Sequence, residues 1–468
     1  MKTAKPFRHF DLLVKLPALL VLSVLTLCQA LSPALLQAKD PPAKTPSGVS
    51  SKASAKAKSK PKTQANVKAP ADSLPWPQNI LALAGNGAVL VKDSHAAPGQ
   101  PQELYAHNAE KYYVPASILK IVTSGAALEF LGPDFRFKTD FLLTRNHDLW
   151  IVGYGDPYLV SEELALIVKE LQKLGLNDIN NIYIDDSYFE KGLVLDGNTQ
   201  TRSPFDAYNV AFSANYNTVS FQKDKKGRIS RAAAHIPLTP LALKLAAETK
   251  GTGTFTLNIS ENPEAAELNS GELFKAHLKE AGLSVRGEIF TGRTAPARRK
   301  VFYRHESSIP LEVAVKYLME YSNNFMSNQI FLALGAELYG PPATLAKSQA
   351  AMNVFFQRHA LDPIVMGDGS GLSRRTTLTA RQMTDVLQVV EPDRYLFTPS
   401  RDGRVLAKTG TMSDIKTLAG YLERSGEPDR PLSFVILLNG PGYTGTRDRI
   451  LDLLKARFLD DPPGAGGR

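Results

Sequence analysis

The chain of 468 residues contains a single cysteine, Cys28. One cysteine cannot form an intrachain disulfide, and it excludes the paired-cysteine motifs of redox and zinc sites. Cys28 lies in the N-terminal segment 1–38, which we expect to be removed, so that the remaining chain would contain no thiol. The core must then hold the fold without covalent cross-links.

The motifs of two large hydrolase classes are also missing. No Gly-x-Ser-x-Gly occurs, and the eight histidines form no His-Glu-x-x-His or other metal-binding spacing. These absences argue against a Ser-His-Asp hydrolase and against a metalloenzyme. We expect neither a metal nor a cofactor.

The net charge of +9 is concentrated at the N-terminus. Residues 1–38 carry +3 and residues 39–72 carry +6, which leaves residues 73–468 formally neutral. The folded part therefore lacks the excess of basic residues that accompanies nucleic-acid binding, and we expect no nucleic-acid partner.

The sequence also lacks an apolar run of the about 20 residues that a membrane-spanning helix needs. Its longest N-terminal run, Leu16–Cys28, follows a basic stretch and precedes small residues, which is the pattern of a cleavable export signal. We predict export to the periplasm or another extracytoplasmic compartment, with residues 1–38 as signal peptide. An uncleaved signal would leave the protein membrane-associated.

A composition change marks the domain organisation. Residues 39–75 are rich in Lys, Ala, Ser and Pro and have almost no aliphatic side chain to bury, which predicts a disordered linker. Strands and helices then occur in blocks, which favours an α+β fold with an antiparallel sheet. The expected parts are a discontinuous domain of residues 76–155 and 299–463, an inserted region of residues 156–298 and a disordered tail of residues 464–468.

Local patterns place the main elements. Ile80–Val91 has strand-like apolar content, whereas the periodicity of residues 117–130 is typical of a helix. Two further helices are predicted at 310–321 and 325–338, separated by Ser322-Asn323-Asn324.

Four Ser-x-x-Lys motifs occur, at Ser59, Ser117, Ser220 and Ser413, so that the motif alone identifies nothing. Only Ser117 opens a predicted helix, where side chains at i and i+3 meet and Lys120 can reach the serine hydroxyl. A serine hydroxyl is a weak nucleophile until a base takes its proton, and a lysine of lowered pKa can be that base. Ser117 and Lys120 are therefore candidate catalytic residues.

Three Ser-x-Asn motifs occur, at Ser213, Ser260 and Ser322. The first lies in a strand-like run and the second closes a strand. Ser322 and Asn324 instead lie at a break between two helices, where side chains can project into a cleft. We select this pair, although a helix cap is the structural alternative.

Lys408-Thr409-Gly410-Thr411 occurs once and follows the strand-like Arg404–Ala407. At the end of an edge strand, this sequence can present an ammonium group, a hydroxyl and a closely approaching backbone to an extended peptide. An exposed turn is the alternative. The order 117, 322, 408, with each motif in suitable local structure, argues against coincidence.

This set of motifs resembles that of the penicillin-recognising serine acyl-transferases, which include penicillin-binding proteins and class A β-lactamases. The long interval between Ser117 and Ser322 is similar to that of class C low-molecular-mass penicillin-binding proteins, the D-alanyl-D-alanine carboxypeptidase/endopeptidase family. The resemblance covers roughly residues 77–460. Further stretches fit it: Gly155-Asp156-Pro157 and the segments 183–187, 368–374 and 418–421.

The resemblance implies a penicillin-binding transpeptidase-like domain, with an antiparallel sheet flanked by helices and a large inserted mixed α/β region. It implies a serine-type D-Ala-D-Ala carboxypeptidase, a DD-endopeptidase or both, acting on peptidoglycan through an acyl-enzyme on Ser117. The partners would be stem peptides with D-Ala-D-Ala ends or diaminopimelate cross-links, with β-lactams as covalent inhibitors. The linker 39–75 would be a solvated spacer or a weak contact to membrane or anionic wall polymer.

The resemblance also implies a role for each motif residue. Ser117 would attack the carbonyl carbon, Lys120 would be the general base, and Ser322 would relay a proton to the leaving amine. Asn324 would bind the substrate amide. Lys408 would attract the terminal carboxylate and help to keep Lys120 neutral by like-charge repulsion.

The same resemblance implies two binding features around these residues. The backbone N–H groups of Ser117 and Thr411 would form the oxyanion hole, beside Thr409 and Gly410. A pocket for a diaminopimelate-type side chain, which ends in an amine and a carboxylate, would be lined by Asp156, Leu372, Arg374 and Met412. A turn at Asp156 and a structural ion pair at Arg374 are the alternatives.

Two other functions are compatible with the motifs. A serine β-lactamase would turn over penicillin rapidly, whereas a long-lived acyl-enzyme on Ser117 favours the peptidase. A non-catalytic wall-binding scaffold of the same fold would tolerate Ser117→Ala, but all motif positions are filled. The balance between carboxypeptidase and endopeptidase stays open.

Overall fold

The computed structural model describes residues 74–259, 262–296, 300–427 and 429–460. The predicted signal peptide, most of the linker, the tail 464–468 and the residues Cys28, Ser59 and Ser260 lie outside the described residues. The chain divides into two compact units after Asn79, and the elements from β1 onward belong to the second. No helix of the described ranges is long and apolar enough to span a membrane.

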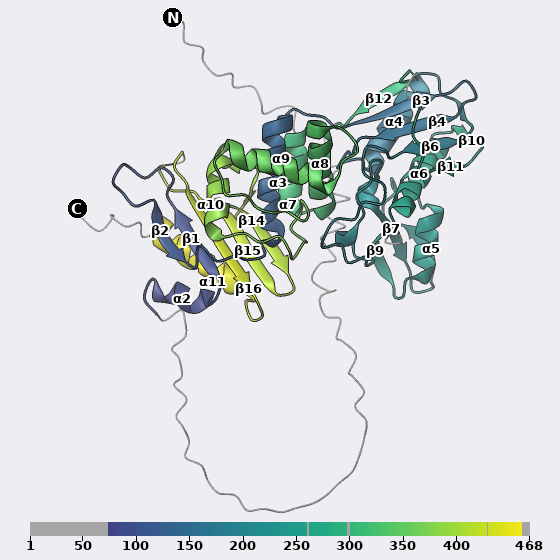
Figure 1. Cartoon of the computed structure of the whole chain (residues 1–468). Coiled ribbons are helices and arrows are strands. Elements are labelled where there is room, and N and C mark those ends of the chain that lie inside the picture. Colours follow the sequence, from purple (N-terminus) through teal and green to yellow (C-terminus); the bar gives the residue numbers. More distant parts are fainter. Residues whose placement is uncertain (1–73, 260–261, 297–299, 428, 461–468) are drawn as a thin grey trace, which may run out of the picture. The chain divides into compact units, whose positions relative to one another are not determined.

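The first layer of the second unit is a fully antiparallel six-stranded sheet of order β13-β14-β15-β16-β1-β2 (Figure 1). Because β1 pairs with β16, the two ends of this unit meet in one sheet. The strands are β1 (Ala88–Lys92), β2 (Glu103–His107), β13 (Thr398–Pro399), β14 (Val405–Met412), β15 (Ile415–Leu422) and β16 (Leu432–Asn439).

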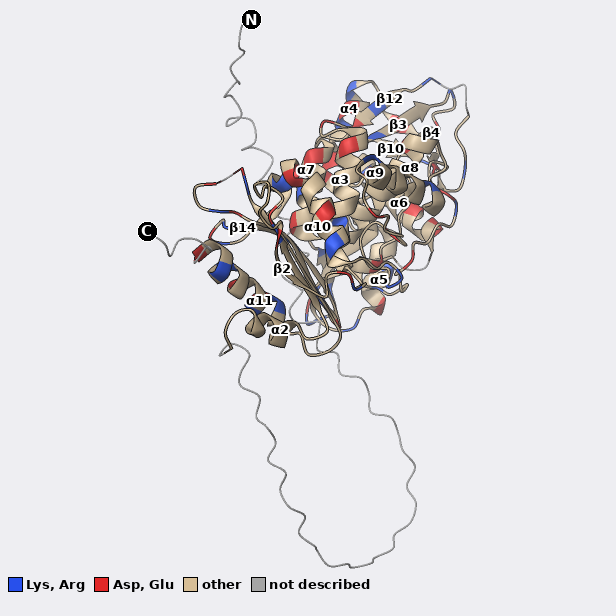
Figure 2. Ribbon diagram, turned by 60° about the vertical axis from the view of Figure 1, so that its left-hand side comes forward, with Lys and Arg blue, Asp and Glu red and all other residues tan. Residues whose placement is uncertain are grey.

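Helices cover both faces of this sheet, and β15 and β16 are accordingly buried along almost their whole length (Figure 2). Helix α11 (Thr446–Lys455) lies on one face. The other face carries α3 (Leu119–Leu131), α7 (Leu311–Tyr321), α8 (Asn324–Tyr339), α9 (Leu345–Arg358) and α10 (Ala380–Val389). The predicted α+β class with an antiparallel sheet is confirmed.

The prediction of one strand over Ile80–Val91 is wrong in its first half. Helix α2 (Gln78–Ala84) precedes β1. Leucine and alanine in this segment are good helix formers, and Gly85 follows the helix with a left-handed φ of 54°. Apolar content alone does not separate a short buried helix from a strand.

The second large sheet is mixed and has the order β11-β6-β4-β3-β12. Strands β4, β6 and β11 pair in parallel (β4 with β6, β6 with β11), whereas β3 is antiparallel to β4 and β12. Its strands are β3 (Lys138–Leu143), β4 (Leu149–Gly153), β6 (Ile182–Asp185), β11 (Ile289–Phe290) and β12 (Tyr303–Glu306).

Helices α4 (Ser161–Lys173) and α6 (Pro263–Glu280) share an apolar core with this sheet, in which Phe141, Ile184 and Phe274 are buried. The region is therefore mixed α/β, as predicted. Its smaller elements are β5 (Asp178–Ile179), β10 (Ser284–Val285), β7 (Thr218–Lys223), β8 (Ile229–Arg231), β9 (Gly253–Asn258) and α5 (Pro240–Glu248). Short helical turns span Pro204–Asp206, Asn215–Asn217, Glu391–Leu396 and Ala456–Asp460.

The expected domain boundaries lie after residues 155 and 298. The division of the strands between the two large sheets does not follow these boundaries. Strands β3 and β4 precede the first boundary and β12 follows the second, yet all three belong to the five-stranded sheet. Pairing between strands that are far apart in the chain leaves no local sequence signal, so that the boundaries could not be read from the motifs. Residues 138–306, which contain the whole five-stranded sheet, are therefore called the inserted region.

Candidate active site

Ser117 lies in a short 3-10 turn, Ala116–Ile118, that leads directly into α3. Lys120 follows in the first turn of α3 and is fully buried, with its Nζ 3.0 Å from Ser117 Oγ. The predicted meeting of these side chains at a helix start is confirmed. Ser220 lies in β7 and Ser413 in the turn after β14, so that neither has this geometry.

Three oxygen atoms accept hydrogen bonds from Lys120 Nζ, and none of them is charged. Besides Ser117 Oγ they are Asn324 Oδ1 at 2.7 Å and the carbonyl oxygen of Ser370 at 2.8 Å. Burial, followed by the positive charge of Lys408, lowers the pKa of Lys120 well below its ordinary value. A lysine whose pKa is lowered in this way loses its proton more readily and can then act as a base.

The break between α7 and α8 turns Ser322 toward β14. Ser322 ends α7 in the left-handed conformation, with φ 55° and ψ 34°. The side chain of Asn323 then caps α8 by accepting a hydrogen bond from Met326 N at 3.0 Å. Both the predicted cap and the predicted cleft position therefore occur in one motif, because Asn323 makes the cap while Asn324 contacts Lys120.

Lys408 reaches Ser322 from the sheet side. Its Nζ donates a hydrogen bond to Ser322 Oγ at 2.8 Å and another to the carbonyl oxygen of Thr409 at 3.0 Å. Burial, aided by the charge of Arg447, lowers the pKa of Lys408 to about 7. The three motifs thus meet in one site: Ser117 from the turn before α3 and Lys120 from α3, Ser322 and Asn324 from the helix break, and Lys408 from β14.

The sequence pattern indicated a strand only over Arg404–Ala407, but the strand that carries Lys408 is longer. β14 continues to Met412 because β15 pairs with it along its whole length. On its other side, β13 pairs only with Leu406 and Ala407. Among the described strands, none pairs with the outer edge of β14 beyond Ala407. Thr409 and Thr411 are exposed there.

Gly410 allows β14 to approach the nucleophile. A Cβ atom at this position would lie 3.0 Å from Ser117 N and 2.8 Å from the carbonyl oxygen of Pro115. Only glycine avoids this conflict. Thr417 Oγ1 on the neighbouring strand donates to the same Pro115 oxygen at 2.7 Å and holds the segment before Ser117 against the sheet.

The four residues of the predicted side-chain pocket are only partly brought together. Arg374 donates two hydrogen bonds to the carboxylate of Asp414, which lies in the hairpin just after Met412. Leu372 instead lines a narrow recess together with residues 193–196 and Asn328. The structural ion pair considered for Arg374 is therefore present.

Asp156 is buried in the segment that follows β4. Its Oδ1 accepts a hydrogen bond from Tyr158 N at 2.8 Å, and its Oδ2 has no hydrogen-bond partner among the described residues. Burial, reinforced by the charge of Glu163, raises the pKa of Asp156 to about 7. No hydrogen bond within the described ranges joins Asp156 to Arg374, so its pocket role stays a prediction.

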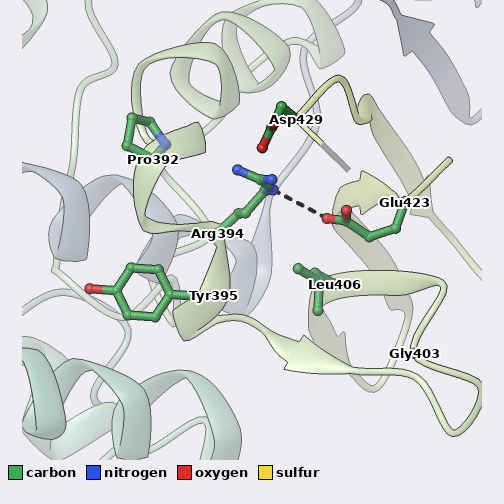
Figure 3. A pocket seen from close by; sticks show the side chains of 7 residues that line it. All are labelled: Pro392, Arg394, Tyr395, Gly403, Leu406, Glu423 and Asp429. Carbon is green, nitrogen blue, oxygen red and sulfur yellow. Dashed lines mark hydrogen bonds and ion pairs between the residues drawn. The ribbon is translucent and has the colours of Figure 1, made fainter. Parts of the chain in front are cut away.

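A surface pocket of about 430 Å³ lies apart from these residues (Figure 3). Arg394 crosses it and forms an ion pair of 3.2 Å with Glu423. The pocket contains none of the candidate residues, and it adjoins β14 at Leu406, before the Lys408 motif. It is therefore not part of the candidate site.

The model of the D-Ala-D-Ala carboxypeptidase 3 (S13) family matches residues 82–398. The chain belongs to this family. The match includes the motifs at Ser117 and Ser322 and ends before Lys408. The predicted family is thereby confirmed, and the protein is an enzyme, a serine-type peptidase that acts on peptidoglycan.

Individual relatives agree with the family. A D-alanyl-D-alanine carboxypeptidase of Actinomadura sp. (strain R39) is 27% identical over an alignment of 413 positions, which covers 72% of this chain and 76% of the relative. The D-alanyl-D-alanine carboxypeptidase DacB of Haemophilus influenzae is 24% identical over an alignment of 405 positions, which covers 73% of this chain and 83% of the relative.

Solved structures show the same fold. The crystal structure of penicillin binding protein 4 (dacB) from Haemophilus influenzae superimposes with a TM-score of 0.65 at 20% identity, over 80% of this chain and 98% of that chain. The predicted fold, a penicillin-binding-protein domain with a large insertion, is confirmed by this likeness.

Sequence reasoning missed two residues that shape the site, Asp368 and Ser370. Asp368 is fully buried, and its carboxylate accepts hydrogen bonds from the backbone N–H groups of residues 370–373. This arrangement holds the loop in which the Ser370 carbonyl faces Lys120. The signal was present: an aspartate followed by Gly-Ser-Gly is typical of a tight turn that the side chain stabilises.

Proposed function

We propose that this enzyme cleaves D-Ala-linked amide bonds of peptidoglycan stem peptides through an acyl-enzyme on Ser117. The observation that carries the proposal is the buried Lys120 Nζ, 3.0 Å from Ser117 Oγ and bonded only to uncharged oxygens. A neutral amine in this position takes the hydroxyl proton while Oγ forms a bond to the carbonyl carbon.

The tetrahedral intermediate then collapses with loss of the leaving amine. Its oxyanion would be held by the backbone N–H groups of Ser117 and Thr411, which Gly410 allows to lie close together. Ser322, 2.8 Å from Lys408 Nζ, would pass a proton to the leaving nitrogen. That proton comes from Lys120, which is then neutral again. Lys120 would next take a proton from the water molecule that attacks the ester and give it to Ser117 Oγ as the carboxylic acid is released.

The substrate would bind as an added strand along β14. Among the described strands, none covers the outer edge beyond Ala407, which therefore stays open to an extended peptide. Lys408 would attract the terminal carboxylate, Thr409 and Thr411 would line the edge, and the side chain of Asn324 would bind the substrate amide.

A side-chain pocket for a diaminopimelate-type residue completes the proposal. Arg374, about half exposed and fixed by Asp414, would meet the carboxylate of that side chain. Asp156 would meet its amine, and Leu372 and Met412 would contact the aliphatic part. The carboxylate of Asp156 and the guanidinium of Arg374 would thus match the amine and the carboxylate at the end of such a side chain.

The cellular setting follows from the N-terminal sequence. We expect residues 1–38 to direct export to the periplasm or another extracytoplasmic compartment, where peptidoglycan lies. The basic linker 39–75 would add a weak contact to the membrane or to anionic wall polymer. A related structure from Haemophilus influenzae is described as a complex with a novel β-lactam, and we expect β-lactams to acylate Ser117 here.

The test is labelling of the purified enzyme with a fluorescent penicillin, followed by peptide mapping and by digestion of isolated muropeptides. We expect one stable label, on Ser117. Ser117→Ala should abolish it, whereas Ser220→Ala, a change in another Ser-x-x-Lys motif, should not. Absence of label from Ser117 contradicts the mechanism, and rapid loss of the label identifies a β-lactamase. Release of free D-Ala or of monomers from cross-linked dimers measures the two peptidase activities.

A further inference from the structure

The inserted region contacts helix α8 through a pair of buried amides. Asn209 Nδ2 donates to Gln329 Oε1 at 2.8 Å and to the carbonyl oxygen of Phe325 at 3.0 Å. Gln329 is fully buried, and its Nε2 donates back to the carbonyl oxygen of Val210 at 3.0 Å. Asn209 donates twice, and Gln329 both accepts and donates, so these three hydrogen bonds fix the relative position of the two segments.

A second contact of the inserted region meets the same turn of α8. The ring of Tyr216 packs edge-on against Phe325, with centroids 6.0 Å apart. Tyr216 is the middle one of three consecutive left-handed residues, 215–217, with φ of 48°, 59° and 52°. Ser213, before this turn, does not lie in the strand that the sequence suggested, because β7 begins only at Thr218.

The left-handed run is unusual, since residues other than glycine adopt this conformation singly. It persists only where the surroundings hold it. Asn215 is held by Ser161, whose backbone N donates to Asn215 Oδ1 at 2.8 Å and whose Oγ accepts from Asn215 Nδ2 at 2.9 Å. Asn217 is fully buried and is held by a hydrogen bond from Ser270 Oγ at 3.1 Å. A costly conformation is thus kept at the residue that touches Phe325.

The opposite flank of α8 faces the catalytic residues. Asn324, the first residue of the helix, places its Oδ1 2.7 Å from Lys120 Nζ. One turn later, Ser327 Oγ donates to the Gly369 carbonyl at 2.7 Å, and Asn328 Oδ1 accepts from Gly369 N at 2.9 Å. The first two turns of α8 are therefore held between the Asp368 loop and the inserted region.

We infer that Asn209 and Gln329 are positioning residues for acylation: they hold the start of α8 so that Asn324 orients Lys120 against Ser117. Neither of the two touches the reacting atoms. The inference rests on the proposed function, and it makes the inserted region a part of the catalytic arrangement. A displacement of about 1 Å at a catalytic contact can lower a rate by about a hundredfold, so that a remote pair can control it.

The experiment measures acylation of the full-length protein by a fluorescent penicillin under rapid mixing. In Asn209→Ala we expect the first-order acylation constant to fall at least about tenfold, with the initial dissociation constant within about twofold of wild type. The matched control is Asn258→Ala. Asn258 is also buried in the inserted region, but its Nδ2 donates to the carbonyl oxygens of Thr201 and Asp206, within that region.

A rescue variant separates positioning from general stability. Asn209→Gln keeps the amide and adds one methylene. We expect it to slow acylation as Asn209→Ala does. If Asn209→Ala does not fold, Asn209→Gln replaces it in the experiment. Combining it with Gln329→Asn restores the combined length of the pair, and we expect at least half of the wild-type rate to return.

Three results would overturn the inference: wild-type acylation by Asn209→Ala or Asn209→Gln, an equal loss in Asn258→Ala, or no recovery in the combined variant. Failure of the proposed function looks different, because the wild-type protein would then carry no label on Ser117. If the wild-type protein is labelled on Ser117 and the Asn209 variants are acylated as fast as wild type, the positioning role is contradicted but the proposed function is not.

Discussion

The candidate active site and the inserted region both bury ionisable side chains, but they do so in opposite ways. In the candidate site, Lys120 and Lys408 are buried with hydroxyl, amide and carbonyl oxygens as their acceptors. In the inserted region, buried Glu163 accepts hydrogen bonds from Ser308, and its Oε2 lies 2.9 Å from His305 Nε2.

The difference explains what each cluster is suited for. A buried amine without a carboxylate partner is more stable uncharged, and its pKa falls into the range where it can exchange protons. A buried acid beside a histidine keeps a partner for its charge, and such a pair fixes structure. Asp156 belongs to the inserted region but resembles the two lysines, because burial shifts its pKa toward the uncharged form as it does theirs.

The largest expected effect comes from removing the buried base. Lys120→Met should lower the rate of acylation by penicillin at least about a thousandfold, because Ser117 loses its proton acceptor. The free energy of unfolding should not fall, since a buried amine that is costly to desolvate is replaced by an apolar side chain of similar volume. Stopped-flow labelling and urea unfolding measure the two quantities. The control is Lys223→Met, the lysine of the Ser220 motif, and a catalytically competent Lys120→Met would break the comparison.

The reverse outcome is expected in the inserted region. Glu163→Ala should lower the free energy of unfolding by about 3–5 kcal/mol, because His305 and Ser308 lose a buried partner. The acylation rate per folded molecule should stay close to that of wild type. Urea unfolding with active-site titration checks both statements. A loss of rate at unchanged stability would show that this pair, too, serves catalysis.

The lowered pKa of the buried Lys408 should make the free energy of unfolding depend on pH. In the unfolded chain this lysine keeps its proton up to about pH 10.5, whereas in the folded protein it loses the proton near pH 7. Between these values the unfolded state binds more protons, so stability should rise with pH, by at most about 1.4 kcal/mol per unit. Lys408→Met should remove this rise in urea unfolding series. An unchanged slope in the variant would refute the lowered pKa.

The smallest effect is expected at Asp156, with the opposite sign. Its pKa is raised from 3.8 to about 7, so that between these values the folded state binds more protons and stability should fall as pH rises. Asp156→Asn should remove this fall and should weaken binding of stem peptides that carry a free side-chain amine. Unfolding series and Michaelis constants for free and acetylated amines check the two effects. Equal constants for both peptides in wild type would exclude Asp156 from the pocket.

Local signals predicted much of the fold and of the site. The helix that begins at Ser117, the break at Ser322 and the strand before Lys408 all follow from short-range patterns, and the structure contains each of them. Where the local pattern was ambiguous, as for the apolar segment Ile80–Val91, the prediction was wrong in part. The burial of Lys120 could be anticipated from its required chemistry, but not its third acceptor, the Ser370 carbonyl.

The sequence by itself determined the residue types and their order: a serine and a lysine one helical turn apart, a Ser-x-Asn at a helix break, and a glycine two residues after Lys408. These are local properties, and the chemistry that they permit could be stated without coordinates. Only the tertiary structure decided which strands belong to which sheet, that Asp368 holds the loop facing Lys120, and that Asn209 meets Gln329. Such contacts join segments distant in the chain, and their geometry depends on the packing of the whole fold.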